Sequence, residues 1–270
     1  MSNFERLSPG RLSGALELIL MDTSAFHLFD ERDAWYHYFL AQLLPRSDEY
    51  MLELLVSCFF AMHPSGVVMP PYNGYLDDVL NTLGRCMMES RGWNGDDISV
   101  GSMLLRSNDL RGQSWFSWDA SGDFSASMYF CLKYLPSSLI QDWFASVLAI
   151  RSPHWRARVL VWLVGSHAAL RGDIASPSAF PAVTFPSVAW EGSHCLGQEL
   201  VSYDRFGPGS VASFLPTTSR ETVLAVTRRY FAENVLDSWL ESVSQVPYLE
   251  SELADIPSTF ERLYVVRPNR

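Results

Sequence analysis

The sequence predicts an all-α fold of antiparallel helix pairs, and two observations support this. Apolar residues recur every three to four positions along several segments, which places them on one face of a helix. Prolines and glycines interrupt these runs at short intervals, so that consecutive helices become antiparallel neighbours. Because 48% of the 270 residues are hydrophobic, the chain can bury a large core, and we expect a single domain over residues 1–270.

Three segments predict surface helices with one buried face. They are residues 75–90, 137–150 and 233–245. In the second of them, the apolar residues form a single stripe along the helix, made of Leu139, Ile140, Trp143, Phe144, Val147 and Leu148. Each of the three helices is therefore expected to pack against the core from outside.

Two further segments predict the centre of the fold. Residues 48–62 and 154–170 are apolar on nearly every side over their middle turns, as expected for helices surrounded by other helices. Ser152 places a capping hydroxyl before Pro153 at the first helical position of the second segment, and Gly172 follows its end. These signals define where the second central helix starts and stops.

The helices form successive pairs from residue 30 to residue 90 and again from 124 to 172. The pairs span roughly 35 to 45 residues, the size of the units in HEAT-like arrays. No repeated signature accompanies this spacing. A HEAT-like α-α array and an irregular orthogonal helical bundle therefore remain alternatives.

Two non-helical insertions interrupt the pattern, at about residues 106–124 and 174–209. The first is rich in glycine, serine and aspartate and carries Trp115, Phe116 and Trp118, rigid aromatic side chains of the kind that dominate protein interfaces. The second has four prolines and no helical period. Its many apolar residues predict that it packs against the helices, because a flexible linker would contain fewer of them.

Charge and composition exclude several classes of protein. The net charge of −10, from 30 acids and 20 bases, opposes binding to nucleic acid and favours a basic or neutral protein partner. Lys133 is the single lysine, and it lacks the glycines of a phosphate-binding loop; P-loop enzymes and Schiff-base enzymes are thus disfavoured.

The remaining composition predicts a protein without bound groups. Four widely spaced cysteines indicate neither a zinc site nor a disulfide framework, and we expect no metal and no cofactor. No apolar run is long enough to span a bilayer, and the first ten residues do not resemble a secretion signal. We expect a cytoplasmic protein; its oligomeric state is left open.

Bases gather at the predicted start of the second central helix. Arg151, His154, Arg156 and Arg158 lie where exposed backbone N–H groups favour an anion, and arginine can hold a carboxylate or phosphate through two parallel hydrogen bonds. The alternative is that these arginines form ion pairs with nearby acids or cover apolar surface with their stems.

Asp33 and His37 lie one helical turn apart, a spacing that suits either two metal ligands or a carboxylate that orients a histidine. The second interpretation is favoured because no matching acid and histidine pair occurs elsewhere.

The paired acids Asp77 and Asp78, with Asn234 and Ser238 on a later helix, resemble the magnesium- and diphosphate-binding motifs of terpene cyclases, which are all-helical enzymes. The resemblance covers only these positions. Asn81 stands where the last acid of the first motif is expected, and a solvated helix face is the favoured interpretation of the acids.

These observations favour a non-catalytic protein-binding module, such as an adaptor, an inhibitor or an immunity-type protein. The module would present an acidic surface and the aromatic loop, which carries Trp115, Phe116 and Trp118, to its partner. The alternative is an enzyme acting on a small anionic substrate in a pocket between helices. That enzyme would use residues such as Asp33, His37, His154 or Arg158, with 174–209 as a lid. A third possibility is a structural subunit of a larger assembly.

Overall fold

The structure is a computed structural model that describes residues 14–16, 18, 29–43, 52–66, 68, 70, 72–84, 93–94, 97–98, 122–184, 186–197, 214–232, 235–246, 249 and 253–265. The regular structure in these ranges is helical apart from one short antiparallel pair, β1 (Trp93–Asn94) and β2 (Asp97–Ile98), in which Trp93 lies opposite Ile98. The predicted all-α fold is confirmed. None of the described helices combines the length and the apolar character needed to cross a bilayer.

The described helices include those that periodicity predicted at 48–62, 137–150, 154–170 and 233–245, together with others that it did not single out. In chain order they are α2 (Phe29–Leu43), α3 (Leu52–Met62), α4 (Tyr75–Val79), α7 (Asp123–Tyr134), α8 (Ser137–Ala149), α9 (Pro153–Arg171), α12 (Thr217–Tyr230), α13 (Val235–Ser244) and α15 (Ile256–Tyr264). Shorter elements are the π-helix η3 (Leu80–Gly84), the 3-10 turns η6 (Pro177–Ala179) and η7 (Ser193–Cys195), and α10 (Phe180–Val183). The predicted helix over 75–90 thus begins as α4 and continues as η3.

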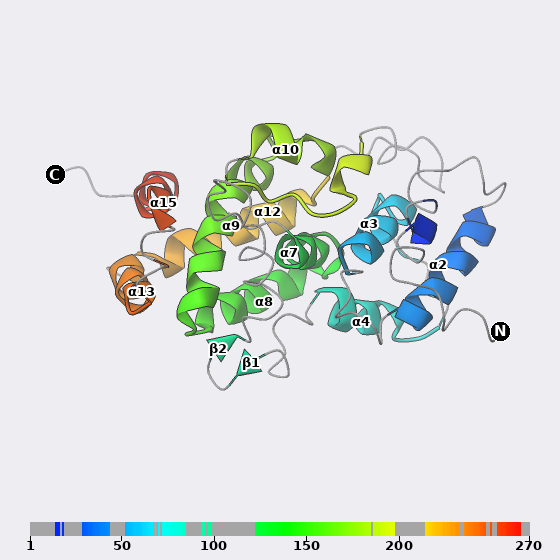
Figure 1. Ribbon diagram of the computed structural model, residues 1–270, viewed down its shortest axis with the longest axis horizontal. Coiled ribbons are helices and arrows are strands. Elements are labelled where there is room, and N and C mark those ends of the chain that lie inside the picture. Colours follow the sequence, from blue (N-terminus) through cyan, green and yellow to red (C-terminus); the bar gives the residue numbers. More distant parts are fainter. Residues whose placement is uncertain are drawn as a thin grey trace.

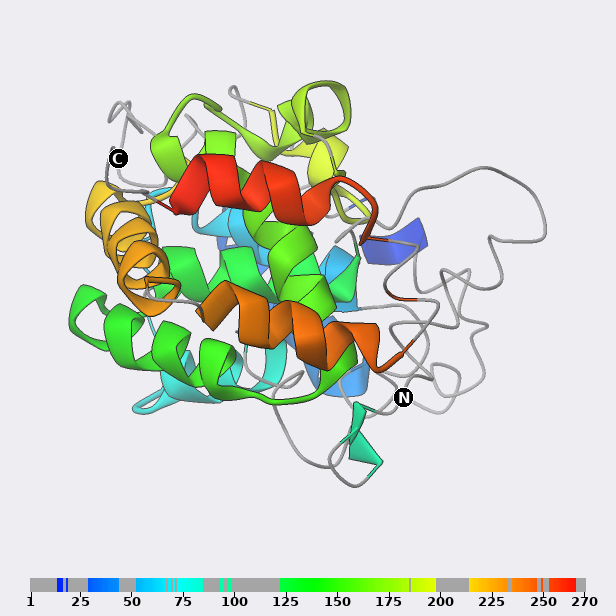
Figure 2. The same cartoon turned by 90° about the vertical axis from the view of Figure 1, so that its left-hand side faces the viewer.

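The helices are arranged along one long axis (Figure 1), with α2, α3 and α4 at one end and α13 and α15 at the other. Between these ends lie α7, α8, α9 and α12. Helix α9 packs against α12, α13 and α15, and the view in Figure 2 places α13 and α15 in front of it. Helix α9 thus contacts helices that follow it far along the chain.

Both predicted central helices are buried. Every residue of α3 is buried, and α9 is buried over most of its length. Ser152 caps α9 by accepting a hydrogen bond from the backbone N–H of Trp155, and Gly172 ends it with φ 86°, a left-handed conformation that glycine adopts without strain. The expected start and stop signals of α9 are therefore confirmed.

Helix α7 is buried from Phe124 to Tyr134 and packs against α3 and η3. The predicted insertion at 106–124 therefore ends before Asp123, where this helix starts. On α8, the buried stripe is Ile140, Trp143, Phe144, Val147 and Leu148. Leu139, which the periodicity had assigned to this stripe, is instead exposed.

The described part of the second insertion packs against the helices, as predicted. Ile174, Phe180, Val188 and Trp190 are all buried. Residues 174–197 are not wholly without helix, because η6, α10 and η7 form short helical turns along them.

Residues 186–197, called the strap below, are held by hydrogen bonds from two buried helices. From α3, Glu53 accepts from the backbone N–H of Glu191 (2.6 Å), and Ser57 donates to the carbonyl of the same residue (3.0 Å). From α7, Ser125 donates to the carbonyl of Val188. These hydrogen bonds hold the strap against the buried helices α3 and α7.

Candidate functional site

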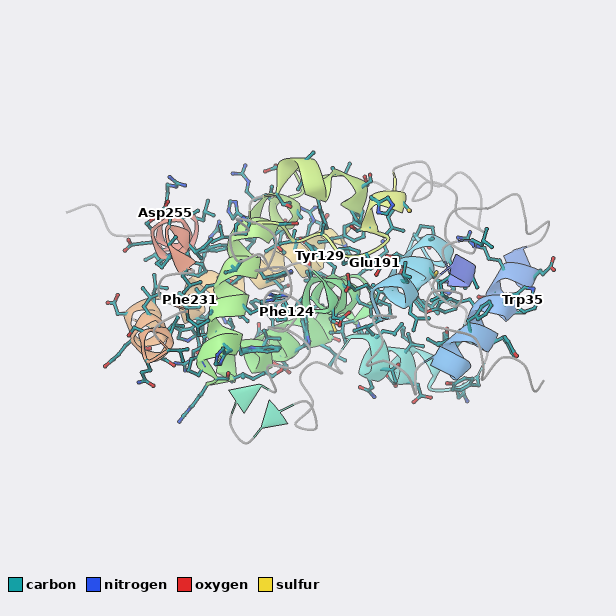
Figure 3. The ribbon with its side chains drawn as sticks, viewed as in Figure 1. Trp35, Phe124, Tyr129, Glu191, Phe231 and Asp255 are labelled. Carbon is teal, nitrogen blue, oxygen red and sulfur yellow. The ribbon has the colours of Figure 1, made fainter. Side chains whose placement is uncertain are left out.

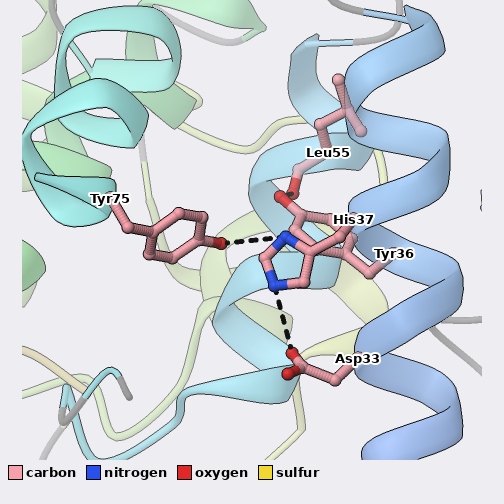
Figure 4. Close-up of polar contacts among 5 residues, drawn as sticks. All are labelled: Asp33, Tyr36, His37, Leu55 and Tyr75. Atoms are coloured by element: carbon pink, nitrogen blue, oxygen red, sulfur yellow. Dashed lines mark hydrogen bonds and ion pairs between the residues drawn. The ribbon is translucent and has the colours of Figure 1, made fainter. Parts of the chain in front are cut away.

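Helix α2 presents a carboxylate and an imidazole toward helix α4 (Figure 4). Asp33 Oδ1 lies 3.6 Å from His37 Nε2. On the other side of the ring, His37 Nδ1 lies 3.4 Å from the hydroxyl of Tyr75, the first residue of α4. The interpretation of Asp33 as a carboxylate that orients His37 is confirmed, and the structure adds a phenol to the pair.

The phenol of Tyr75 connects this pair to a second acid. The rings of Tyr72 and Tyr75 meet edge to face with centroids 5.5 Å apart. The Tyr72 hydroxyl donates a hydrogen bond of 2.9 Å to the carboxylate of Asp78. Asp33, His37, Tyr72, Tyr75 and Asp78 thus form one continuous group, called the α2–α4 site below.

The α2–α4 site has a buried floor and an accessible rim. Tyr75 is 2% exposed, whereas Tyr72 is 52% exposed. The side chains of His37 and Asp33 remain 26% and 30% exposed. A partner can therefore reach two carboxylates, one imidazole and one phenol ring.

Burial sets the charge state of the α2–α4 site. It lowers the pKa of His37, an effect that the nearby Asp33 carboxylate opposes. Burial also raises the pKa of Tyr75, and the charge of Asp33 adds to this rise. At pH 7 the imidazole is neutral and the phenol is protonated; in the tautomer that carries its proton on Nε2, the N–H faces Asp33 and Nδ1 is the acceptor for Tyr75.

The lowered pKa of His37 predicts a loss of stability in acid. Below pH 6.5 the unfolded chain binds a proton at His37 more readily than the folded chain does, so the free energy of unfolding falls as the pH drops from 7 to 5. Protonation also removes the acceptor for Tyr75, a hydrogen bond of about 1 kcal/mol. In urea unfolding at pH 5 and pH 7, His37→Gln should reduce this acid sensitivity relative to the wild type.

The α2–α4 site lies in the acidic part of the chain. Residues 1–84 contain 11 acids and 4 bases, whereas residues 122–232 contain 7 acids and 9 bases. Within the described part of α2, the basic residue Arg32 is 3% exposed, and α4 contains no base. The accessible charge around the α2–α4 site is therefore negative.

The four bases at the start of α9 lie in different surroundings. The guanidinium of Arg158 is buried 5.9 Å from the centre of the Phe124 ring. Arg156 lies over the Trp239 ring of α13, 5.3 Å from its centre, and Arg151 is exposed. His154 is partly buried. Arg156 and Arg158 thus each lie over an aromatic ring.

Other predicted sites lie apart from one another or outside the described residues. Trp115, Phe116, Trp118 and Asn234 fall outside them. Asp77 on α4 and Ser238 on α13 lie at opposite ends of the molecule, so these two positions of the cyclase-like motifs do not face each other (Figure 1).

The residues named for the enzyme alternative are separated in the same way. Asp33 and His37 belong to α2 at one end, whereas His154 and Arg158 belong to α9, which lies beyond α3 and α7 from α2 (Figure 1). Figure 3 shows Trp35 of α2 and Phe231, which follows α12, far apart along the long axis. Among the described residues, no three His, Cys, Asp or Glu side chains are placed to hold a metal ion.

The burial of Lys133 was not predicted from the sequence. Lys133, the single lysine, is 6% exposed on α7, and its Nζ donates a 2.8 Å hydrogen bond to the carbonyl of Phe214. Burial lowers its pKa to about 7. The available signal was the apolar character of its neighbours in the sequence, Cys131, Leu132 and Tyr134.

No family model, curated protein or solved structure matches this chain. The α2–α4 site is consequently interpreted from its own chemistry.

Proposed function

We propose that this protein is a non-catalytic binding module that receives a basic side chain of a protein partner at the α2–α4 site. The arrangement of two carboxylates, Asp33 and Asp78, beside the accessible ring of Tyr72 carries this proposal. Carboxylates form strong charge-assisted hydrogen bonds with arginine and lysine, and aromatic rings attract the same cations through their faces.

The charge of the whole chain supports a basic partner. The net charge is −10, and residues 1–84 supply most of the excess of acids over bases. A field of this sign speeds the encounter with a positively charged surface and repels acidic competitors.

The geometry of His37 favours binding over catalysis. A histidine that acts as a general base needs one ring nitrogen within reach of the substrate. Here Asp33 lies beside Nε2 and the hydroxyl of Tyr75 beside Nδ1. Tyr75 itself is buried, so its hydroxyl is poorly placed to attack a substrate.

The double variant Asp33→Asn and Asp78→Asn tests the proposal. Both asparagines keep a carbonyl that can accept a hydrogen bond, and only the charges are lost. Partners captured by the wild-type protein are identified by mass spectrometry, purified and measured by calorimetry. Affinity for the true partner should fall about tenfold or more, and its dependence on salt should weaken.

The matched control is Asp237→Asn with Glu241→Gln, which removes two exposed carboxylates of α13 at the far end. This control should bind as the wild type does. Equal binding by all three proteins would overturn the α2–α4 site as the contact surface. Thermal unfolding of each variant shows that a loss of binding does not come from a loss of fold.

A further inference from the structure

Arg32 lies on α2 but on a different face from the α2–α4 site. Its neighbours Glu31 and Asp33 are accessible, whereas Arg32 is 3% exposed. It lies near α3, close enough for its charge to interact with the thiol of Cys58. A guanidinium is thus enclosed where α2 packs against α3.

Two nitrogens of Arg32, Nε and Nη2, are buried and have no hydrogen-bond acceptor among the residues that the structure describes. Nearby acceptors already receive other donors. The hydroxyl of Tyr36 donates to the carbonyl of Leu55 (3.1 Å), and the thiol of Cys58 donates to the carbonyl of Leu16 (3.4 Å). Among the described residues, these hydrogen bonds leave Nε and Nη2 of Arg32 without an acceptor.

These neighbours do not supply a negative charge that would balance the guanidinium of Arg32. A guanidinium stays protonated at any accessible pH, so it cannot escape the cost of burial by losing its proton. The thiol of Cys58 is neutral at pH 7, because burial raises its pKa to about 12. An anion at Arg32 would satisfy both the charge and the two N–H groups.

We propose that Arg32 binds an oxyanion, a carboxylate or a phosphate, at the contact between α2 and α3. The N–H groups of Nε and Nη2 lie on the same edge of the planar guanidinium. That edge matches the two oxygens of a carboxylate or phosphate and forms two parallel hydrogen bonds with them. The site is independent of the proposed partner contact, since it uses another face of α2 and the opposite charge.

Thermal unfolding of the full chain tests this site with inorganic phosphate and acetate as probes, against chloride at the same ionic strength. Binding of either probe at about ten times its dissociation constant should raise the wild-type Tm by about 3 °C. Arg32→Met should abolish the shift and raise the Tm in chloride, because it removes an uncompensated buried charge. A response to phosphate alone identifies a phosphate site, and an equal response to acetate identifies a carboxylate site.

Two further variants separate a specific site from a general effect of salt. Arg32→Lys keeps the charge but loses the paired N–H groups, so a smaller shift is expected. Arg151→Met removes an exposed arginine and should respond as the wild type does. The proposal is overturned if Arg32→Met keeps the full shift. It is also overturned if neither probe shifts the Tm of the wild type.

Discussion

Gly165→Ala is expected to destabilise the protein by about 3 kcal/mol or more, because the strap passes directly over this residue. A Cβ atom at Gly165 would lie 2.3 Å from the carbonyl oxygen of Pro186 and 2.7 Å from Val188 Cγ1. The carbonyl belongs to the backbone, so it cannot turn aside as the end of a flexible side chain can. The strap would have to leave α9 or the helix would have to move.

The matched control is Gly14→Ala. A Cβ at Gly14 meets no heavy atom within 4 Å, and the residue is helical, so alanine should be neutral or slightly stabilising there. Urea unfolding of both variants and the wild type gives the comparison. If Gly165→Ala unfolds at the wild-type urea concentration, the strap does not pack on α9 as the structure places it.

Local sequence signals predicted α9 and α8 because their determinants lie within each helix. The Ser152 cap, the glycine at position 172 and the apolar period of 137–150 are all readable without knowledge of the fold. The contact between Asp33 and His37 was predictable for the same reason. Residues one turn apart on a helix lie close together regardless of the surrounding fold. Leu139 shows the limit of predicting burial from periodicity. It lies at the edge of the apolar stripe and is exposed, because the burial of an edge residue depends on the neighbouring helices.

The burial of α7 depends instead on partners far along the chain. Its polar residues Ser125, Ser127 and Lys133 reduce the apolar period, yet all are buried. Ser127 donates to the carbonyl of Leu83, 44 residues away, and Lys133 to that of Phe214, 81 residues away. Buried polar groups require such partners, and spacing within the helix cannot reveal them.

The α2–α4 site was only half predictable for the same reason. Asp33 and His37 are near each other through helix geometry, but Tyr75 reaches His37 across 38 residues. The pattern of 75–90 predicted a helix there without indicating which helix its first turn would touch. The phenol and the second acid therefore had to come from the tertiary structure.

Lys133→Met is expected to raise the free energy of unfolding at pH 7 by about 2 kcal/mol. Burial lowers the pKa of Lys133 from 10.5 to about 7, which costs the folded state about 4 kcal/mol at pH 7 relative to a chain whose lysine is freely protonated. Methionine removes this cost and fills a similar volume. The carbonyl of Phe214 loses its donor, and this loss offsets about 1–2 kcal/mol of the gain.

The pH dependence of this gain distinguishes a buried amine from a simple packing effect. Above pH 10.5 the lysine is neutral in both the folded and the unfolded chain, so it carries no penalty. As the pH falls toward 7 the unfolded chain takes up the proton first, and the penalty grows until both states are protonated. The wild type should therefore gain stability relative to Lys133→Met between pH 7 and pH 10 in urea unfolding, while the exposed substitution Arg262→Met should give a constant difference. Parallel curves for wild type and Lys133→Met would show that the amine keeps its ordinary pKa in the folded protein.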